Sequence, residues 1–331
     1  MIPRLSDNIS VVARSERLVP EAVDVVVTVP TFKRPQWLLR TLRSLKDQRT
    51  DRRFAVIVIE NEAQKREGAN AARPLIESGE LPGMVIVAHD RGNCSAYNAG
   101  WTTAFVHFPN FSHIAVIDDD EIATPDWLEN LLNTTERFGA DIIGGPQVQM
   151  FENPAHRRWA DHPVFRPPYD ESGTVGALYS SGNLLVSRRV PEALGTPFLD
   201  PMFNFIGGGD SDFLSRARHA GFRLAWCAEA EVHETVPARR VEARWIRARG
   251  LRNGVISTMV EKRRRAKQPF GRLIVLAHSL ALLGASPFRA AIGLVRTGSP
   301  AIASYPVHVA LGRVLSEFGY ANEQYREPEK N

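Results

Sequence analysis

Residues 113–125, HIAVIDDDEIATP, join a short apolar run to four consecutive carboxylates. The run at 114–117 is typical of a buried strand, and Thr124 with Pro125 is a helix-start signal. Two like charges about 4 Å apart repel by roughly 4 kcal/mol at an effective dielectric constant near 20. A bound cation would remove that cost, so the stretch predicts a buried strand that ends in a metal-dependent site.

Apolar runs of the same kind occur on both sides of this stretch. Three of them precede it, at 23–29 (VDVVVTV), 54–59 (FAVIVI) and 84–88 (MVIVA). Two later strands are predicted at 183–187 and 222–227. Amphipathic helices are predicted between strands, as where Leu38, Leu42 and Leu45 recur at helical spacing. Buried strands that alternate with helices predict an α/β fold with a mostly parallel sheet, right-handed crossovers and helices on both faces.

Charge is unevenly distributed along the 331 residues, which carry a net charge of +4. Residues 238–272 hold twelve Lys or Arg against two Glu, a local net charge of +10, so the remainder is mildly acidic. Only two cysteines occur, and the first residues lack the apolar core of a secretory signal. We therefore expect a cytoplasmic protein with an acidic body and a basic C-terminal segment.

Polar clusters follow each of the first four predicted strands. They are Thr31 to Arg34, Glu60 to Glu62, Asp90 to Asn93 and the acidic run itself. Ligands of open α/β sheets bind beyond the carboxyl ends of the strands, so these clusters are expected to form one site. Carboxylate oxygens suit Mg²⁺ or Mn²⁺, which usually bind one or two carboxylates together with substrate phosphates. The pattern therefore predicts a divalent metal and a nucleoside diphosphate ligand.

A second signal is FNFIGGGDSDFLSRARHAG at 203–221, in which three glycines lead into two aspartates at a helix start. Glycine lets the backbone approach a bulky ligand, and Asp210 is suited there to act as a general base. Ordinary N-capping of the helix by Asp210 is the alternative. The run lacks the G-x-G-x-x-G pattern of a dinucleotide site. His233, after the strand at 222–227, is in such a position more often structural than a metal ligand, and the ligand role stays open.

Taken together, these motifs resemble family 2 glycosyltransferases of the inverting, metal-dependent type with the GT-A fold. VTVPTFKRPQWLLRTLRSLKDQ resembles the family's opening strand, loop and helix, VIDDDEIATPDWLENL its Asp-x-Asp motif, and GGGDSDF the motif that supplies the base. ETVPARRVEARWIRARGLRNG is similar to bacterial exopolysaccharide transferases of the succinoglycan type. The resemblance covers residues 23–254, roughly two thirds of the chain.

The resemblance implies a role for particular residues. Asp210 would be the base that deprotonates the acceptor hydroxyl, and Asp120 would bind the metal, with His233 as a weaker candidate ligand. The nucleotide sugar would contact Pro30, Thr31, Arg34, Glu60, Arg91, Asn98, Asp118 and Asp119. The acceptor would lie against a loop and helix that carry Gly208, Gly209, Asp212, Arg240 and Trp245.

Three positions depart from the family pattern. Glu60 stands where aspartate is usual, Gly209 replaces the glutamate before the base, and Tyr97 stands where arginine is common. UDP is the expected donor nucleotide, but the glutamate at position 60 bears on base recognition, so GDP and dTDP stay open. The glycine leaves the following aspartate intact, so Asp210 keeps its predicted role as the base.

The expected organisation is an N-terminal arm at 1–22, a GT-A domain at 23–240 and a helical region at 241–331. The domain is expected to divide near residue 150. Its first half would bind the nucleotide sugar, and its second half, 151–240, would bind the acceptor and carry the base.

Two stretches of 16 residues in the helical region, 273–288 and 297–312, contain no Lys, Arg, Asp or Glu. Each is shorter than the ~20 apolar residues that span a bilayer, and prolines and His278 interrupt them. They are either core helices or interfacial segments beside the basic cluster at 262–267, whose residues would contribute roughly 1 kcal/mol each near an anionic leaflet. We expect peripheral association with the cytoplasmic face of the inner membrane, where a polyprenyl-linked saccharide acceptor would lie.

Other classes of function fit less well. A sugar-phosphate nucleotidyltransferase would need a glycine-rich basic loop after the first strand, and TVPTFKRPQ has no glycine. A nucleic-acid binder could use the segment of net charge +10, but the acidic body argues against nucleic acid as a partner. A catalytically degenerate membrane scaffold is distinguished from an enzyme by a transfer assay. The donated sugar, the acceptor hydroxyl and the oligomeric state do not follow from the sequence.

Overall fold

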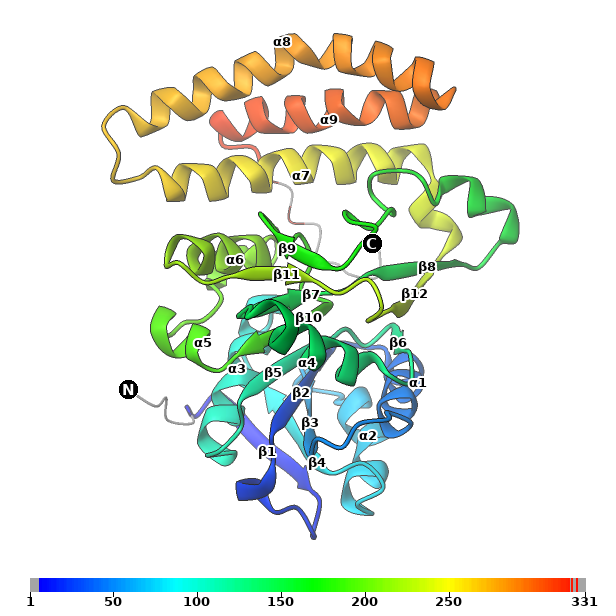
Figure 1. The fold of residues 1–331 in the computed structure, drawn as a ribbon, viewed down its shortest axis with the longest axis vertical. Helices are drawn as coiled ribbons and strands as arrows, with labels where there is room; N and C mark the ends of the chain where they lie inside the picture. The colour runs from blue at the N-terminus through cyan, green and yellow to red at the C-terminus, as the bar shows by residue number, and fades with distance from the viewer. Residues whose placement is uncertain (1–5, 322, 324–325, 327–331) are drawn as a thin grey trace. The chain divides into compact units, whose positions relative to one another are not determined.

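The computed structural model describes residues 6–321, 323 and 326 (Figure 1). The chain divides into two compact units. Unit 1 comprises Met1–Val148, Pro168–Asn204 and Asp212–Glu234, and unit 2 comprises Gln149–Pro167, Phe205–Ser211 and Thr235–Asn331. These bounds differ from the expected domains, because 149–167 and 205–211 belong with the C-terminal helices although the sequence places them in the sheet domain.

In the described part of the chain, unit 1 is built on a nine-stranded sheet in the order β1-β4-β3-β2-β5-β10-β7-β11-β9. The central pairs, from β4 through β3 and β2 to β5, are parallel, and β10 runs antiparallel to both of its neighbours. This confirms the predicted fold class, an α/β fold with a mostly parallel core. The strands are β1 (Ile9–Arg14), β2 (Val25–Thr31), β3 (Phe54–Glu60), β4 (Gly83–Ala88), β5 (His113–Ile117), β7 (Ile142–Gly144), β9 (Gly173–Val175), β10 (Asn183–Ser187) and β11 (Leu224–Trp226).

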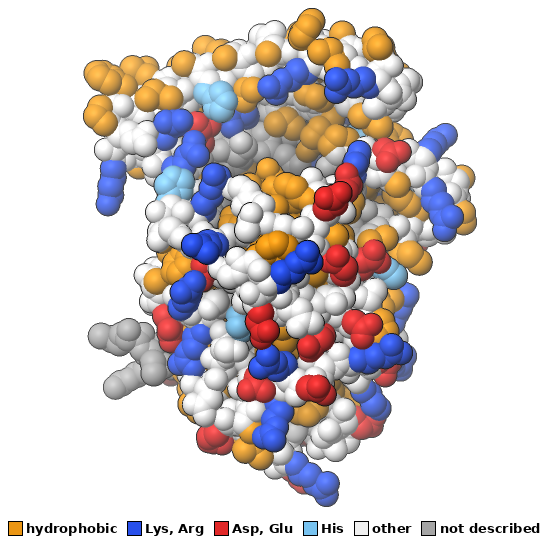
Figure 2. All heavy atoms as spheres, in the orientation of Figure 1, with side chains coloured by type: hydrophobic (Ala, Val, Ile, Leu, Met, Phe, Trp, Pro, Cys, Tyr) orange, Lys and Arg blue, Asp and Glu red, His pale blue; other side chains and the backbone are white. Residues whose placement is uncertain are grey.

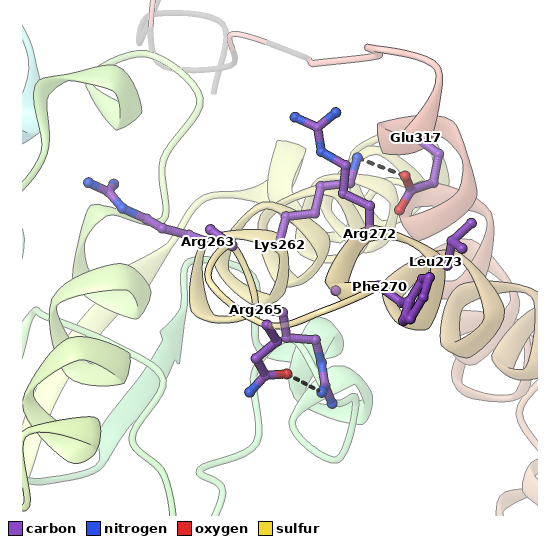
Figure 3. A pocket seen from close by; sticks show the side chains of 10 residues that line it. Lys262, Arg263, Arg265, Phe270, Arg272, Leu273 and Glu317 are labelled. Atoms are coloured by element: carbon purple, nitrogen blue, oxygen red, sulfur yellow. Dashed lines mark hydrogen bonds and ion pairs between the residues drawn. The ribbon is translucent and has the colours of Figure 1, made fainter.

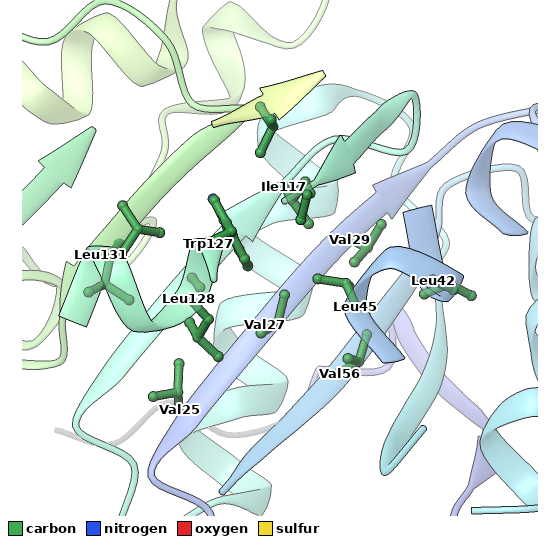
Figure 4. Close-up of a cluster of buried hydrophobic side chains, with 14 of the residues drawn as sticks. Val25, Val27, Val29, Leu42, Leu45, Val56, Ile117, Trp127, Leu128 and Leu131 are labelled. Atoms are coloured by element: carbon green, nitrogen blue, oxygen red, sulfur yellow. The ribbon is translucent and has the colours of Figure 1, made fainter. Parts of the chain in front are cut away.

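Helices cover both faces of this sheet. Alternate residues of β2 point to one face, where they pack against α1 (Pro35–Lys46) and α4 (Trp127–Phe138). Helix α3 (Asn93–His107) covers the other face, where Gly100 allows close approach to Ile59 of β3. The remaining helices of the unit are α2 (Glu67–Glu77), α5 (Arg189–Leu194) and α6 (Gly209–His219), the last of which begins in unit 2. Figure 4 shows the first of these core faces, with Val25, Val27, Val29, Leu42, Leu45, Val56, Ile117, Trp127, Leu128 and Leu131 labelled.

The N-terminal residues do not form the expected arm. Residues 9–14 form β1, which pairs antiparallel with β4 so that Ile9 lies opposite Ala88 and Arg14 opposite Met84. The side chain of Ser15 then accepts a hydrogen bond from the Gly83 amide at 3.0 Å. Strand β1 was missed because it is a half-exposed edge strand whose sequence, ISVVAR, has no continuous apolar run. It covers the sheet edge that β4 would otherwise expose.

A second sheet in the described residues is small, with three strands in the order β6-β12-β8. Its strands are β6 (Glu121–Ala123), β12 (Val232–Val236) and β8 (Gln147–Phe151). In the antiparallel pair of β6 with β12, Glu234 lies opposite Glu121 and His233 opposite Ile122. Strand β6 therefore begins inside the acidic run, and β12 brings a fifth carboxyl group beside it.

Unit 2 contains three long helices, α7 (Ala243–Arg264), α8 (Gly271–Thr297) and α9 (Pro300–Glu317), which lie side by side in Figure 1. A Cβ atom at Gly312 of α9 would lie 2.0 Å from the Leu251 carbonyl oxygen of α7, so these two helices pack at backbone distance. An ion cluster takes one residue from each helix. Arg313 of α9 donates to Glu261 of α7 at 2.5 Å, and His278 of α8 lies 3.1 Å from the same carboxylate. Short helices η2 (Pro154–Trp159) and η4 (Ala238–Val241) belong to the same unit, and η1 (Pro20–Ala22) and η3 (Pro201–Phe203) to unit 1.

Helix α8 is longer than the apolar stretch that the sequence indicates. It continues through Pro287 for 27 residues, about 40 Å at 1.5 Å per residue, which exceeds the ~30 Å of a bilayer core. Among the described residues it is the one helix long and apolar enough to cross a membrane, and only 17% of its most apolar window is buried. Figure 2 shows hydrophobic side chains along this part of the surface with cationic side chains among them, and the cations of α8 itself are arginines. The expectation that prolines interrupt this segment was wrong, since an exposed helix can lose one backbone hydrogen bond at proline and continue.

Candidate active site

The acidic run after β5 lies beside the loop that follows β2. The Thr31 hydroxyl donates to Asp119 Oδ2 at 2.7 Å, although the two residues are 88 positions apart. Arg34 Nη1 donates to Asp120 Oδ2 at 2.7 Å and lies 3.4 Å from Asp119 Oδ1. The parallel pairing of β2 with β5 brings these two loops to one edge of the sheet. Four of the residues predicted to bind the nucleotide sugar and the metal are thereby gathered in one place.

The aspartates of the run hold more negative charge than their surroundings readily accept. Burial raises the pKa of Asp118 to about 7, and the charges of Asp120 and Asp119 add to the effect. Burial likewise raises the pKa of Asp119 to about 7, while Arg34 and Thr31 oppose the shift. The Tyr97 hydroxyl donates to Asp118 Oδ1 at 3.1 Å, so the residue that replaces the family's arginine supplies a hydrogen bond but no charge. The cluster is therefore suited to bind a cation.

Glu121, the fourth carboxylate, has a structural role. It is fully buried, it accepts the Asp118 amide on Oε2 at 2.9 Å, and it accepts Gln147 Nε2 on Oε1. Burial raises its pKa well above the ordinary range. The Thr41 hydroxyl fixes the same turn by donating to the carbonyl oxygens of Asp119 and Glu121, at 3.0 and 2.6 Å. Glu121 thus holds the turn that presents the three aspartates.

Gly182 is a residue of this site that the sequence did not indicate. A Cβ atom there would lie 2.6 Å from Glu121 Oε1 and 2.8 Å from Asp118 Oδ2. Neither carboxylate can move freely, because Glu121 is hydrogen-bonded and buried and Asp118 is bonded to Tyr97. The absent side chain is therefore part of the geometry of the acidic run.

We expect Gly182→Ala to displace Asp118 and weaken nucleotide binding about tenfold, because inserting one methyl group into such a site costs about 1–3 kcal/mol. Gly173→Ala is the matched control, since no atom lies within 4 Å of a Cβ atom at that position. Titration of UDP in Mn²⁺ measures the effect, with thermal unfolding as the check on folding. Equal affinity of the two variants would contradict the assignment.

Two residues predicted to touch the nucleotide make hydrogen bonds within the protein. Glu60 is fully buried and accepts the amides of Glu62 and Ala69, at 2.9 and 3.0 Å, and burial raises its pKa. Asn98 both donates to and accepts from the backbone of Leu199, at 2.7 and 2.9 Å. These contacts hold loops in place. Direct contact of either side chain with the nucleotide stays a prediction.

Two other predicted residues lie at the same edge of the sheet. Pro30 lies in β2 opposite Ile59 of β3. The Arg91 guanidinium lies 5.1 Å from the centre of the Phe32 ring, between the loops that follow β4 and β2. The Lys33 ammonium lies 5.2 Å from the centre of the same Phe32 ring. This basic and aromatic cluster is suited to an anionic nucleotide.

Asn61 is a second residue whose role only the structure reveals. Its side-chain amide donates to the carbonyl oxygens of Ala88 and Asp90, at 3.1 and 2.8 Å, and its Oδ1 accepts the Gly92 amide at 2.8 Å. It therefore fixes the loop after β4, which carries Arg91, to the end of β3. Its position directly after a predicted strand was the available signal.

His233 is not brought among the aspartates. It forms an ion pair with Glu231, 3.5 Å away. The residue of β12 whose charge acts on Asp118 and Glu121 is its neighbour, Glu234. Successive side chains of a strand point to opposite faces, so His233 faces away from the side that Glu234 occupies. A ligand role for His233 stays a prediction that this strand does not favour.

Asp210 lies in unit 2, after a glycine turn. Gly207 and Gly208 have φ of 84° and 94°, the left-handed region that favours glycine, and a Cβ atom at Gly208 would lie 2.5 Å from Ile256. Asp210 Oδ1 accepts the Ser211 amide at 2.7 Å. Burial raises the pKa of Asp210, and this hydrogen bond and the charge of Arg249 partly oppose the shift. A half-buried carboxylate with a raised pKa is a candidate general base.

The next aspartate is in a different situation. Asp212 is 2% exposed and its Oδ2 accepts Arg216 Nε at 2.8 Å. Arg216 in turn donates to the Phe198 carbonyl oxygen. Asp212 therefore belongs to a structural ion pair of unit 1. Gly209, between the glycine turn and Asp210, is buried at the first position of α6.

The remaining residues predicted for the acceptor also lie in unit 2. The Trp245 ring has the guanidinium groups of Arg240 and Arg249 at 6.0 and 5.9 Å from its centre. Phe165 stacks on it at an interplanar angle of 7°. Because the charge of Arg249 also acts on Asp210, this aromatic and basic cluster and the candidate base belong to one region of the unit.

The donor atoms fit a divalent metal when a phosphate ligand is included. Asp118, Asp119 and Asp120 offer only oxygen, as Mg²⁺ and Mn²⁺ prefer. No group of three or more His, Cys, Asp or Glu in the described ranges is arranged to hold a metal by itself. In such sites the metal is usually bound by one or two carboxylates together with diphosphate oxygens.

Comparisons with known proteins agree with this arrangement. The model of the family described as Glycosyl transferase family 2 matches residues 26–192. The succinoglycan biosynthesis protein ExoM of Rhizobium meliloti is 32% identical over 242 residues, which are 71% of this chain and 74% of that protein. The glycosyltransferase AglE of Haloferax volcanii is 24% identical over 61% of this chain and 64% of its own length.

A solved structure extends the likeness to the fold. The mannosyltransferase PcManGT from Pyrobaculum calidifontis, solved in complex with GDP-Man and Mn²⁺, aligns with a TM-score of 0.57. The alignment covers 92% of this chain and 89% of that chain at 17% sequence identity. At this identity the likeness shows that the two chains share a fold.

Proposed function

The chain is a glycosyltransferase of family 2, and we propose that it transfers a sugar from a nucleoside diphosphate sugar to a saccharide hydroxyl, with inversion at the anomeric carbon. UDP is the proposed donor nucleotide, and exopolysaccharide biosynthesis the proposed process. The observation that carries the proposal is the group of three aspartates at the carboxyl edge of the sheet, where Thr31 and Arg34 bond Asp119 and Asp120 and Tyr97 bonds Asp118.

The donor side of the reaction is assigned to this group. Asp120 would hold the metal, and Asp118 and Asp119 would orient the nucleotide sugar, with Thr31 and Arg34 fixing the carboxylates. A divalent ion bound with the diphosphate supplies the positive charge that stabilises the leaving group. The raised pKa values of Asp118 and Asp119 support this role, because a cluster that resists full ionisation alone gains most from a cation.

The acceptor side is assigned to unit 2. Asp210 would take the proton of the attacking hydroxyl, and its hydrogen bond to Ser211 orients the carboxylate. Beside Trp245, the side chains of Arg240 and Arg249 offer donors for the hydroxyl or anionic groups of a sugar. An inverting displacement at the anomeric carbon requires a base for the attacking hydroxyl and a stabilised diphosphate as leaving group.

A polyprenyl-linked acceptor and peripheral attachment to the cytoplasmic face of the inner membrane are part of the proposal. Their support is the exposed apolar surface of α8, which includes Leu273, Leu280, Phe288 and Val295. Arginines at 272, 289 and 296 lie on the same helix. An apolar helix surface that carries cations suits an anionic lipid interface.

Thermal unfolding with a panel of nucleoside diphosphates and nucleotide sugars tests the enzymatic proposal. A specific ligand at a hundredfold excess over its Kd stabilises the native state by about 2.7 kcal/mol. We expect the largest shift in melting temperature with a UDP-sugar and Mn²⁺, followed by transfer or slow hydrolysis of that sugar. A metal-dependent shift without any turnover would instead indicate a degenerate scaffold.

Flotation with anionic liposomes tests the membrane attachment. We expect the full chain to float at low salt and Phe288→Asp with Val295→Asp to lower partitioning about tenfold or more, because both side chains are over 70% exposed on α8 and buried apolar area drives insertion. Val19→Asp, an exposed valine of unit 1, is the control. Unchanged flotation of the α8 variant would contradict attachment through this helix.

A further inference from the structure

An open pocket lies in unit 2 at the turn between α7 and α8, with a volume of about 760 Å³ (Figure 3). Four of its lining side chains are cationic, from the end of α7, the turn and the start of α8, and Glu317 of α9 is the one anionic member of the lining. Phe270 and Leu273 also line it. The cations are Lys262, Arg263, Arg265 and Arg272.

The positive charge of the pocket is only partly neutralised. Lys262 pairs with Glu317 at 2.8 Å, and Arg265 with the buried Glu261 at 3.1 Å. Within the part of the chain that the structure describes, the side chain of Arg272 makes no hydrogen bond or ion pair. It lies in the first turn of α8, where the backbone amides and the helix dipole add further positive potential. The pocket therefore favours an anion.

The turn between α7 and α8 is tightly packed. A Cβ atom at Gly271 would lie 2.2 Å from the Arg265 carbonyl oxygen, and the Gly271 amide donates to the Gln268 carbonyl at 3.1 Å. Phe270 has φ of 56°, a left-handed conformation that is a genuine outlier for a bulky residue. Its ring is nevertheless 76% exposed. Such strain in a residue that gains no burial points to a function for the outward-facing ring.

The lining thus combines cationic side chains with the exposed apolar side chains of Phe270 and Leu273. Leu273, 62% exposed, continues from Phe270 toward the apolar surface of α8. A ligand that satisfies both parts has a phosphate group at one end and hydrocarbon at the other. We infer that this pocket binds the phosphate-bearing headgroup of a membrane lipid, an inference that rests on the proposed membrane attachment and specifies its ligand.

The test compares two arginines of α8 in the full chain. Arg272→Ala removes a cation of the pocket, and Arg289→Ala removes an exposed cation of the same helix outside it. Phosphatidylcholine vesicles carry either phosphatidic acid, a phosphomonoester, or phosphatidylglycerol, a phosphodiester, adjusted to equal surface potential. A single basic residue near an anionic surface changes partitioning about fivefold, whereas a charge-assisted hydrogen bond to phosphate changes it about tenfold or more.

We expect tighter binding of the wild type to the phosphatidic acid vesicles, and a loss of at least about tenfold on these vesicles for Arg272→Ala only. Equal losses for the two variants would overturn the pocket assignment. Inorganic phosphate that displaces wild type at micromolar concentration would instead identify a site for free phosphate and also overturn it.

The test also separates this inference from the proposed function. Both variants are expected to keep the nucleotide-dependent thermal shift, because neither residue belongs to the proposed donor or acceptor site. If wild type fails to bind any anionic vesicle, membrane attachment and the pocket assignment both fall. If the vesicles bind but the two arginines behave alike, only the pocket assignment falls.

Discussion

Asp210→Asn is expected to lower sugar transfer by at least ~10²-fold and by as much as ~10⁴-fold, while the Kd for the nucleotide stays within a few fold. The substitution keeps the size of the side chain and removes its ability to take a proton. Nucleotide affinity should survive because the residues proposed to bind the donor belong to unit 1, whereas Asp210 belongs to unit 2. Single-turnover transfer and nucleotide titration measure the two effects separately.

Asp212→Asn is the matched control for that experiment. Asp212 is buried, but its partner Arg216 is 27% exposed, so weakening this hydrogen-bonded pair is expected to cost about 1–3 kcal/mol of stability. We therefore expect a lower melting temperature and near-normal transfer per folded molecule. An inactive Asp212→Asn beside an active Asp210→Asn would show that the base had been assigned to the wrong residue.

The pH dependence of kcat/KM gives a further readout of the same residue. A general base must be deprotonated, so activity falls as the pH drops through its pKa. Because burial raises the pKa of Asp210, the acidic limb should lie at higher pH than for an ordinary aspartate. The limb should disappear in Asp210→Asn. If the acidic limb of that variant lies at the same pH as that of the wild type, the limb belongs to another titratable group.

Asp120→Asn is expected to weaken nucleotide binding at least about tenfold in Mn²⁺ and to leave it nearly unchanged in EDTA. Substituting even an outer-shell partner of a bound metal commonly costs 10–100-fold in affinity or activity, and Asp120 is the proposed direct ligand. The metal would link the carboxylate to the diphosphate, so the loss should depend on its presence. Titration of UDP with and without Mn²⁺ measures the difference.

Asp126→Asn is the control for charge alone. Asp126 is exposed, lies six positions further along the chain and carries no side-chain cap bond to α4. It should bind UDP as the wild type does in both media. Equal affinity of Asp120→Asn and wild type in Mn²⁺ would contradict the role of Asp120.

The sequence alone predicts which segments of the chain come together at the site. Runs of β-branched residues such as 54–59 can be satisfied only by burial on both faces, which requires helices on each side of a parallel sheet. Parallel strands share one carboxyl edge, so polar clusters after 23–29, 54–59, 84–88 and 114–117 had to meet there. The structure confirms these four strands and the contact of Thr31 and Arg34 with the acidic run.

The tertiary structure alone decided which of the polar residues face a ligand. Glu60 and Glu121 are polar residues of the predicted clusters, yet both are fully buried and hydrogen-bonded, and a sequence cannot distinguish a buried carboxylate from an exposed one. Gly182 matters because it has no side chain, and the lack of a side chain at one position produces no periodic pattern in the sequence. Asn61 acts through backbone groups that are distant in the chain.

The same distinction applies to the elements that the sequence misjudged. Strand β1 exists because the edge of β4 has unpaired backbone groups, a requirement set by the finished sheet and invisible in ISVVAR. Helix α8 continues through Pro287 because an exposed helix can lose one backbone hydrogen bond, and α8 is packed against α9. The sequence by itself determined the period of each element and the composition of each loop, because both are local properties. Burial, close approach and edge pairing depend on residues far apart in the chain, and only the folded structure decides them.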